Sequence, residues 1–454
     1  MQVTETSVAG LKRELSVVIP KSELANRYET RVANAQKTVE LKGFRKGKVP
    51  VGHIKKLFGR SLMVEVVEET LNETSRKIIA DRGERPAMQP EIKMTENKDE
   101  VEKLVAGDMD LAFSMAFEVL PKIELADFSK IKLERSKVTP EASEIDKAIE
   151  NLVARATRYE VEEGRAAQDG DQVTIDFVGK IDGVAFEGGA GTDMPVILGA
   201  SGFIPGFEDG LKGAKGGEAR TLNATFPADY SRKDLASKPA VFDATVKSVG
   251  KPVKPEVNDD FAKTVGLETV QALRDAISAQ IQAEYDGLSR QKLKRDLLDA
   301  LDKAHTFDLP PTLVDNEFNG IWEQVNNGLK SQNKTFESEG KTEDGARTEY
   351  RGIAERRVRL GLVIGEVGDR NKVEVNQNEL RDALIQEARK YPGQERFVYE
   401  YYEKNPSALT GLRAPIFEDK VVDLIVSQAQ VTDKSVTKDE LVKSVSDDEE
   451  AAAA

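Results

Sequence analysis

Residues 171–183 read DQVTIDFVGKIDG, a stretch in which apolar and polar side chains alternate before an Asp-Gly turn. Residues 219–227 (ARTLNATFP) and 240–250 (AVFDATVKSVG) repeat the two-residue period. Side chains two apart lie on the same side of a strand, so each segment offers one apolar face to a core. Residues 161–250 are therefore predicted to form a compact domain of antiparallel strands joined by glycine-rich turns. The inward positions of the first strand are Val173, Ile175 and Phe177.

After this domain, over residues 251–432, the pattern changes to helical spacing. A proline-bearing hinge begins at Lys251, and apolar residues from 273 to 298 then mark one long amphipathic helix. Several later helices carry apolar stripes broader than one bundle seam requires. Such surfaces suit either a closed bundle or a cradle for extended polypeptide, and the sequence alone favours the bundle. The segment 433–454, which ends in SDDEEAAAA, is predicted to be a disordered tail.

The residues before the β domain mix both patterns. Residues 1–115 are predicted to form an α+β domain, and residues 116–160 a linker whose second half, 141–160, is helical. The predicted elements of the first domain are helices over 22–43 and 62–79, a strand over 11–19 and a second strand within 105–120. The chain as a whole is thus expected to be a multidomain α+β protein.

Charge is distributed unevenly along the chain. The net charge is −14 over 454 residues, yet residues 1–60 hold thirteen Lys or Arg against five Asp or Glu. An acidic body avoids polyanions, whereas a basic patch at one end can still bind one, so a nucleic-acid or ribonucleoprotein contact is expected there only. The absence of cysteine excludes disulfides and thiolate chemistry. With no signal peptide and no membrane-length apolar run, the expected location is the cytoplasm.

The basic residues concentrate in one loop. Residues 41–60, LKGFRKGKVPVGHIKKLFGR, contain seven Lys or Arg and no carboxylate. Two glycines would let the backbone turn sharply and present an apolar ring and two cations at an exposed tip. Such a tip can bind phosphates or an acidic partner, although Phe44 could instead be buried as a small core anchor. The residues of this candidate site are Gly43, Phe44, Arg45, Lys46, Gly47 and Pro50.

Few residues could support acid–base or metal chemistry. The two histidines, His53 and His305, fall in different predicted domains, so neither a His-based triad nor a metal site is expected, and no cofactor is implied. The glycine-rich stretch 187–193, EGGAGTD, lacks the ending of a phosphate-binding loop and is predicted to be an ordinary loop.

One reaction fits an apolar cleft without a nucleophile or a base. Rotation about an X-Pro bond is slow because the amide loses resonance, with a barrier of ~18–20 kcal/mol. A dry pocket favours the less polar twisted amide, and one donor can stabilise it. Aromatic residues of the β domain could line such a cleft, or could all be core.

The segment GFRKGKVP resembles the ribosome-docking signature of the bacterial trigger factor family. The segments IDFVGKIDGVAFEGG, FIPGFEDGLKG and TFPADY resemble that family's FKBP-type prolyl isomerase domain, and the order of the predicted domains agrees over roughly residues 1–432. The resemblance implies an N-terminal α+β ribosome-binding domain, an FKBP-like antiparallel β domain with a short helix, and an elongated all-α C-terminal domain.

The resemblance also implies a function and partners. It implies a chaperone that docks near the peptide exit tunnel of the ribosome, on a large-subunit protein and adjacent ribosomal RNA, and shelters nascent or unfolded polypeptides. It implies no membrane partner and is compatible with a weak homodimer off the ribosome. In the cleft, Phe177 and Phe207 stand where many relatives have Tyr and Trp, and Glu187 where many have Asp. The implied pocket residues are Phe177, Phe186, Phe203, Ile204, Phe207, Tyr230 and Phe242.

Two other functions are compatible with the sequence. The chain could be a free cytosolic prolyl isomerase whose other domains only recruit substrate. It could also be an RNA-binding protein that contacts RNA through the basic loop alone, although one basic loop with few aromatic residues near it is a weak RNA-binding signal.

Overall fold

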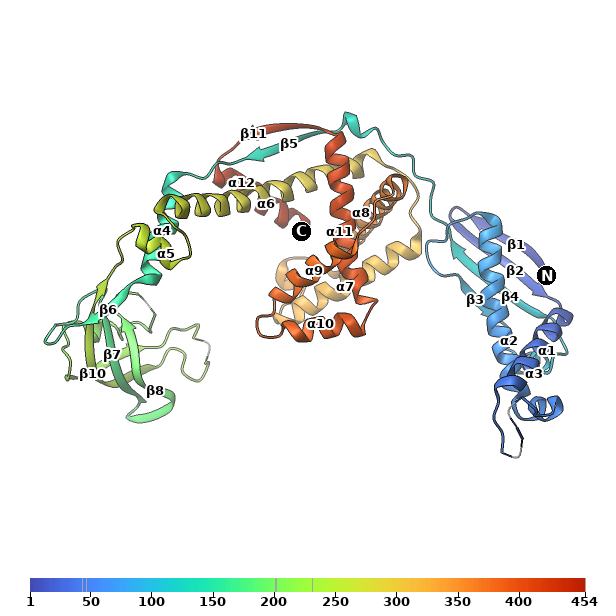
Figure 1. Ribbon diagram of the computed structural model, residues 1–454, viewed down its shortest axis with the longest axis horizontal. Coiled ribbons are helices and arrows are strands. Elements are labelled where there is room, and N and C mark those ends of the chain that lie inside the picture. The colour runs from blue at the N-terminus through green and yellow to red at the C-terminus, as the bar shows by residue number, and fades with distance from the viewer. Residues whose placement is uncertain (43, 46, 201, 231, 454) are drawn as a thin grey trace. The chain divides into compact units, whose positions relative to one another are not determined.

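The computed structural model describes the whole chain except Gly43, Lys46, Ser201, Ser231 and Ala454, and of residues 447–453 only the backbone. The chain divides into two compact units, and each combines segments that are distant in sequence. The first unit holds residues 1–135 and 290–434, and the second holds 136–289 and 435–454. Figure 1 shows the elements of both.

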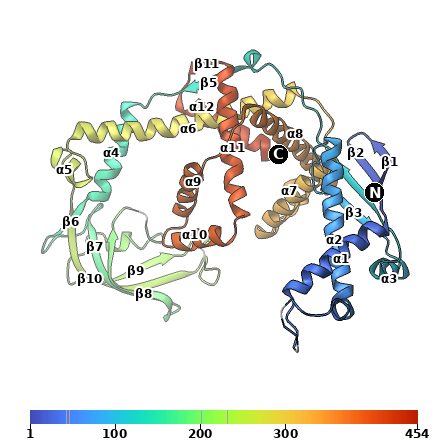
Figure 2. The same cartoon turned by 45° about the vertical axis from the view of Figure 1, so that its right-hand side comes forward.

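An α+β domain forms the N-terminal part of the first unit. Its antiparallel sheet has the strand order β1-β2-β4-β3. Residues on β2 alternate, so that Leu15, Val17 and Ile19 are buried against Phe113 and Met115 of β4 and against α2, which crosses that face of the sheet (Figure 2). The elements are β1 (Gln2–Ala9), β2 (Lys12–Ile19), α1 (Lys21–Thr38), α2 (Val51–Arg82), β3 (Glu91–Met94), α3 (Lys98–Ala106) and β4 (Leu111–Glu118).

The strand predicted within residues 105–120, at LAFSMAFEVL (111–120), is confirmed as β4, and a short helix precedes it. Helix α3 begins where the Asn97 side chain accepts a hydrogen bond from the Asp99 N–H. It ends at Gly107, which has a left-handed φ of +81°. The strand therefore starts only at Leu111, because the cap and the glycine together close a short helix before it.

Helices form most of the rest of the first unit, as the sequence predicts. Leu297 and Leu301 of α6, Val363 and Val367 of α8 and Val421 of α11 share one fully buried core. Strand β5 (Lys132–Lys137) pairs with β11 (Gln430–Ser435). The helices are α6 (Val270–Ala304, of which residues from 290 belong here), α7 (Pro311–Ser331), α8 (Glu343–Asn371), α9 (Gln377–Arg389), α10 (Glu395–Lys404) and α11 (Ala408–Gln428).

The second unit contains the antiparallel β domain. Strand β10 pairs with β6, β7 and β9, and β7 also pairs with β8. The predicted alternation is confirmed, because Val173, Ile175 and Leu222 are fully buried in one core cluster. The strands are β6 (Arg158–Val161), β7 (Gln172–Ile181), β8 (Val184–Ile197), β9 (Ala219–Thr225) and β10 (Pro239–Val253), with a short 3-10 helix over Asp209–Leu211.

The remaining helices of this unit correct the prediction of a disordered tail. Residues 438–453 form helix α12 (Lys438–Ala453). Leu441 is buried with Val138 and Tyr285, where Tyr285 lies on the first half of α6. The low-complexity end obscures this short amphipathic segment, which needs a tertiary partner to be stable. The other helices of the unit are α4 (Ala142–Ala156) and α5 (Asp259–Thr264).

A polar cluster joins α4, α6 and α12 beside these apolar contacts. The Tyr285 hydroxyl donates to Glu144 Oε1 at 2.6 Å, and Lys438 Nζ donates to the same oxygen at 2.9 Å. The hydrogen bond from Tyr285, followed by that from Lys438, lowers the pKa of Glu144 from 4.5 to about 2. Burial raises the pKa of Tyr285, and the Glu144 carboxylate raises it further. The ionised carboxylate therefore stabilises the attachment of α12.

We expect this attachment to weaken in acid. The folded pKa of Glu144 lies below the unfolded one, so its contribution is fully present above pH ~4.5 and is lost as the pH falls toward 2. The Glu144 side chain is 20% exposed, so solvent screens part of the interaction that lowers its pKa. We therefore expect it to contribute on the order of 1–3 kcal/mol to the stability of the α12 attachment. Hydrogen exchange of α12 amides, corrected for intrinsic rates, measures the local opening free energy in wild type and Glu144→Gln.

The difference between the two proteins should be constant from pH 7 to 5 and should shrink below that. The matched control is Glu150→Gln, an exposed carboxylate on the same helix, for which no difference is expected. A Glu144→Gln effect that persisted unchanged at pH 3 would contradict the assignment.

Candidate functional site

The basic loop is fixed at both ends by apolar side chains, one buried and one partly buried. Val49 is fully buried among residues of α1 and α2, including Val32 and Ile54, and Leu41 packs against the same cluster. Gln36 Nε2 also donates to the Val49 carbonyl at 2.7 Å. Pro50 then precedes the first residue of α2, which is why the predicted helix over 62–79 in fact starts at Val51.

Between these anchors, the described residues of the tip are exposed. Phe44 is 40% exposed, and its ring lies 5.5 Å from the exposed His53 ring, so it is not the buried core anchor that the sequence also allowed. Arg45 is exposed and forms no ion pair within the described part of the chain. Gly47 has φ +76°, a conformation that favours glycine. Gly43 and Lys46 lie outside the described residues.

The seven candidate residues of the β domain come together in one cluster. Phe207 stacks on Phe203 at 4.8 Å between ring centroids and meets Phe242 edge-on at 5.1 Å. Phe177 lies 5.5 Å from Phe207, and Phe186 lies 6.1 Å from Phe242. Phe207 and Phe242 are 1% and 5% exposed, so they belong to the core. The partly exposed members, which pack against that core, are Phe177, Phe186, Phe203, Ile204 and Tyr230.

One further aromatic residue of the β domain, predicted from the sequence to lie in a cleft or in the core, also joins this cluster. Phe226 is 4% exposed and lies 4.8 Å from the Tyr230 ring and 5.9 Å from the Phe186 ring. It therefore connects Tyr230 to the rest of the rings. Its position at an inward site of the alternating segment 219–227 predicts this burial.

Glycines on the strands make room for the rings. A Cβ at Gly179 would lie 2.6 Å from a Phe242 ring carbon, and one at Gly189 would lie 2.7 Å from the Phe186 ring. A Cβ at Gly191 would lie 2.8 Å from the Phe177 ring. The prediction that residues 187–193 are a loop is therefore wrong. They belong to β8, and their glycines allow aromatic rings to lie against the strand.

A carboxylate holds the loop that carries two of the exposed cluster members. Glu208 accepts hydrogen bonds from the N–H groups of Gly199 at 2.8 Å, Gly202 at 2.9 Å and Phe203 at 3.3 Å. Bonds from several backbone donors to one charged acceptor fix a loop strongly. This arrangement positions Phe203 and Ile204 over the buried rings.

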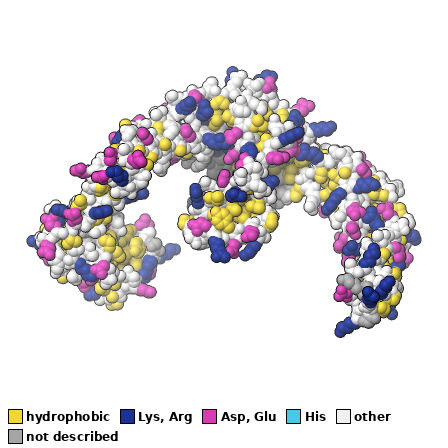
Figure 3. Space-filling model, viewed as in Figure 1, with side chains coloured by type: hydrophobic (Ala, Val, Ile, Leu, Met, Phe, Trp, Pro, Cys, Tyr) yellow, Lys and Arg dark blue, Asp and Glu magenta, His cyan; other side chains and the backbone are white. Residues whose placement is uncertain are grey.

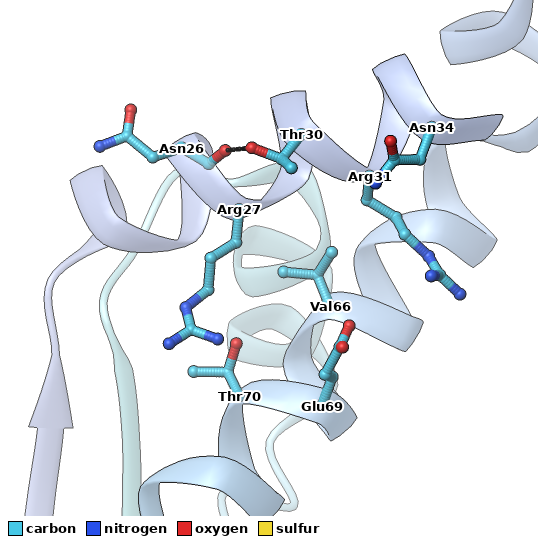
Figure 4. A pocket seen from close by; sticks show the side chains of 8 residues that line it. All are labelled: Asn26, Arg27, Thr30, Arg31, Asn34, Val66, Glu69 and Thr70. Atoms are coloured by element: carbon cyan, nitrogen blue, oxygen red, sulfur yellow. Dashed lines mark hydrogen bonds between the residues drawn. The ribbon is translucent and has the colours of Figure 1, made fainter. Parts of the chain in front are cut away.

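A further recess, of about 320 Å³, lies between α1 and α2 in the first unit. Figure 4 shows Arg27 on α1 reaching toward Thr70 on α2, while Arg31 lies farther along α1 and points away from Thr70. Both arginines are already paired, Arg27 with Glu73 at 2.6 Å and Arg31 with Glu65 at 2.6 Å. The recess therefore offers neither of these charges to a ligand.

Comparisons with known proteins agree with this architecture. The model of "Bacterial trigger factor protein (TF)" matches residues 1–152, and that of its C-terminus matches residues 269–427. The model of "FKBP-type peptidyl-prolyl cis-trans isomerase" matches residues 163–247. A protein named Trigger factor from Xanthobacter autotrophicus is 47% identical, with both chains covered completely. The chain belongs to the trigger factor family.

A second relative agrees with this assignment, and a solved structure shares the fold. Trigger factor of Methylocella silvestris is 50% identical over 97% of this chain and 96% of its own. A solved structure, "Promiscuous Substrate Recognition in Folding and Assembly Activities of the Trigger Factor Chaperone", has the same fold, with a TM-score of 0.57 and 21% identity, over 94% of this chain and 99% of that one.

Membership of this family gives the general function. The chain is a ribosome-associated chaperone that carries an FKBP-type peptidyl-prolyl isomerase domain. A free isomerase or a purely RNA-binding protein is not favoured. Among the described residues, no helix combines the length and the apolar character that crossing a membrane requires.

Proposed function

We propose that this chaperone docks on the ribosome through residues 43–50, near the exit tunnel, and holds emerging chains while its β domain isomerises their X-Pro bonds. The observation that carries the docking proposal is that two apolar anchors, the partly buried Leu41 and the buried Val49, fix a tip at which Phe44 and Arg45 are exposed. An apolar ring between cations suits a ribosomal protein beside ribosomal RNA. Since the ribosome is the docking partner, the proposed site of action is the cytoplasm.

The isomerase proposal rests on the aromatic cluster. Its exposed members form an apolar surface above buried rings, which is suited to a proline ring and a twisted amide. Within the described part of the chain, the backbone N–H of Ile204 has no acceptor, so it is free to donate to a substrate carbonyl. Phe177 provides no hydroxyl. The Tyr230 phenol is the only side-chain donor of the seven candidates.

Helix α10 provides a surface for the client chain. On this helix Phe397 is 71% and Tyr401 50% exposed, whereas Val398 is its buried anchor. Tyr391, which precedes the helix, is also 50% exposed. Phe397 and Tyr401 are one turn apart and share a face. Figure 3 shows hydrophobic side chains gathered on the lobe that contains α10. Exposed aromatic side chains of this kind indicate a surface for apolar segments, and off the ribosome they would also support a weak homodimer.

Two sets of substitutions should separate the two activities. We expect Phe203→Ala with Tyr230→Ala to lower isomerisation of a proline-limited refolding protein at least about tenfold, because both rings contact the substrate. Suppression of aggregation should remain. Phe397→Ser with Tyr401→Ser should weaken suppression of aggregation and leave isomerisation unchanged. Each ring that leaves water on binding a client contributes on the order of 1–2 kcal/mol.

The readouts are the rate of refolding and light scattering of a diluted unfolded protein. Each double variant serves as the matched control for the other. Loss of both activities in the Phe203→Ala, Tyr230→Ala variant would support the alternative, in which the chain is chiefly an isomerase and the other domains only recruit substrate.

A further inference from the structure

An apolar recess of about 190 Å³ lies in the N-terminal domain, between α2, α3 and the end of β3. It is separate from the basic loop and from the aromatic cluster. Leu104 and Val67 form buried parts of its lining. An apolar cavity of roughly 150 Å³ can hold a benzene ring, so this recess has room for one large aliphatic or aromatic side chain.

Exposed apolar side chains surround the opening of the recess. Val64 of α2 is 39% exposed, Met94 of β3 is 43% exposed and Val101 of α3 is 37% exposed, and all three line it. They come from three elements that meet only in the folded domain. Methionine adapts its shape to different partners, which suits a site that accepts several apolar side chains.

The polar residues of the lining are predominantly acidic. Glu68, Glu100 and Asp110 lie around the apolar lining. Glu100 accepts a hydrogen bond from the Thr95 hydroxyl, and Asp110 accepts one from the Lys21 N–H. Within the described residues, none of the three carboxylates is paired with a cationic side chain. An occupant with Lys or Arg beside its apolar side chain would therefore complement the site in charge.

We propose that this recess binds an extended client segment in which one large apolar residue is flanked by Lys or Arg. The apolar side chain fills the recess, and the flanking cations face Glu68, Glu100 and Asp110. The inference rests on the chaperone function and adds to it a second client site, on the N-terminal domain, that prefers cationic flanks.

Photo-crosslinking to the full-length chain tests the proposal. The probe is a synthetic peptide with a diazirine analogue of leucine at its centre and two Lys at each end, and the comparison peptide has Glu at the ends. We expect cross-links from the Lys-flanked peptide within residues 64–68 and 94–112, with at least about fivefold tighter binding than the Glu-flanked peptide. Cross-links confined to α10 would overturn the inference and leave the proposed function intact.

Substitutions separate the apolar part of the site from the charged part. Val64→Ser with Val101→Ser should reduce cross-linking in the recess about tenfold. The matched control is Val257→Ser with Val265→Ser, which removes valines that are 45% and 42% exposed elsewhere, and it should have no effect. Glu68→Lys, on the exposed face of α2, should remove the preference for Lys-flanked peptide. Unchanged labelling in the valine variant, or equal affinity for both peptides, would overturn the proposal.

Two further measurements cover the other outcomes. Circular dichroism checks that each variant is folded, and Val101→Ser alone is the second variant if the pair is not. Sedimentation velocity at rising concentration tests a second copy as the occupant. Self-association that the valine variant abolishes, without peptide cross-links in the recess, would overturn the proposal. Ribosome co-sedimentation of the valine variant should be unchanged. A loss of client binding in the recess can therefore be distinguished from a loss of ribosome docking.

Discussion

The combined variant Phe44→Ala, Arg45→Ala, Lys46→Ala should lose co-sedimentation with ribosomes, with affinity falling roughly a hundredfold or more. A buried aromatic anchor contributes about 2 kcal/mol or more to an interface, and charged contacts to phosphate add to it. Leu41 and Val49 fix the ends of the loop independently of these three side chains. The substitutions should therefore leave the N-terminal domain folded.

The matched control removes one exposed apolar residue and two exposed lysines from the same domain. Val8→Ala, Lys93→Ala and Lys103→Ala make the same change in charge away from the loop and should pellet like wild type. Binding of wild type should also weaken from low to high salt, because the screening length is ~8 Å at physiological ionic strength. If the triple variant pelleted as well as wild type, docking would lie elsewhere.

Gly179→Ala should disrupt the aromatic cluster more than the addition of one methyl group suggests. The new Cβ would lie 2.6 Å from a ring carbon of Phe242 and 2.8 Å from one of Phe186. Phe242 is 5% exposed and packed on all sides, so it has little room to move. We expect a loss of about 1–3 kcal/mol in the stability of the β domain and at least about a tenfold loss of isomerase activity.

Calorimetry and a proline-peptide isomerisation assay measure the two effects. The control is Gly361→Ala in helix α8, where an added Cβ meets nothing within 4 Å and helix propensity predicts a gain of up to about 1 kcal/mol. Gly179→Ala with wild-type stability and activity would show that the rings rearrange freely.

Periodic segments were predictable because their burial pattern is local. The alternation in β7 and the helical spacing in α6 and α8 were enough to assign their type. Elements that depend on distant partners were not predictable. Strand β1 is exposed along its whole length, so it has no periodic signal, and it forms because β2 pairs with it. Residues 187–193 resembled a loop because the reason for their glycines, the neighbouring rings, lies on other segments.

The candidate sites divide in the same way. The sequence shows directly which residues of the loop and of the β domain are apolar, basic or glycine. It also shows the resemblance to a family. Burial separated the roles: Phe207 and Phe242 lie in the core, while Phe203 and Tyr230 remain accessible, because the sheet turns one face inward. The hydrogen bonds that Glu208 accepts from the loop N–H groups were likewise not apparent, since any of the 80 carboxylates could have accepted them.

By itself the sequence determined the order of the folding patterns, the uneven charge and the chemistry available to each segment, because these depend on neighbouring residues. Only the tertiary structure decided that residues 1–135 join 290–434 in one unit, and that Lys438 reaches Glu144 across almost three hundred residues. It also decided that Val64, Met94 and Val101 surround one recess. The physical reason is that burial and pairing between distant segments depend on which surfaces meet, and no local pattern of side chains encodes that directly.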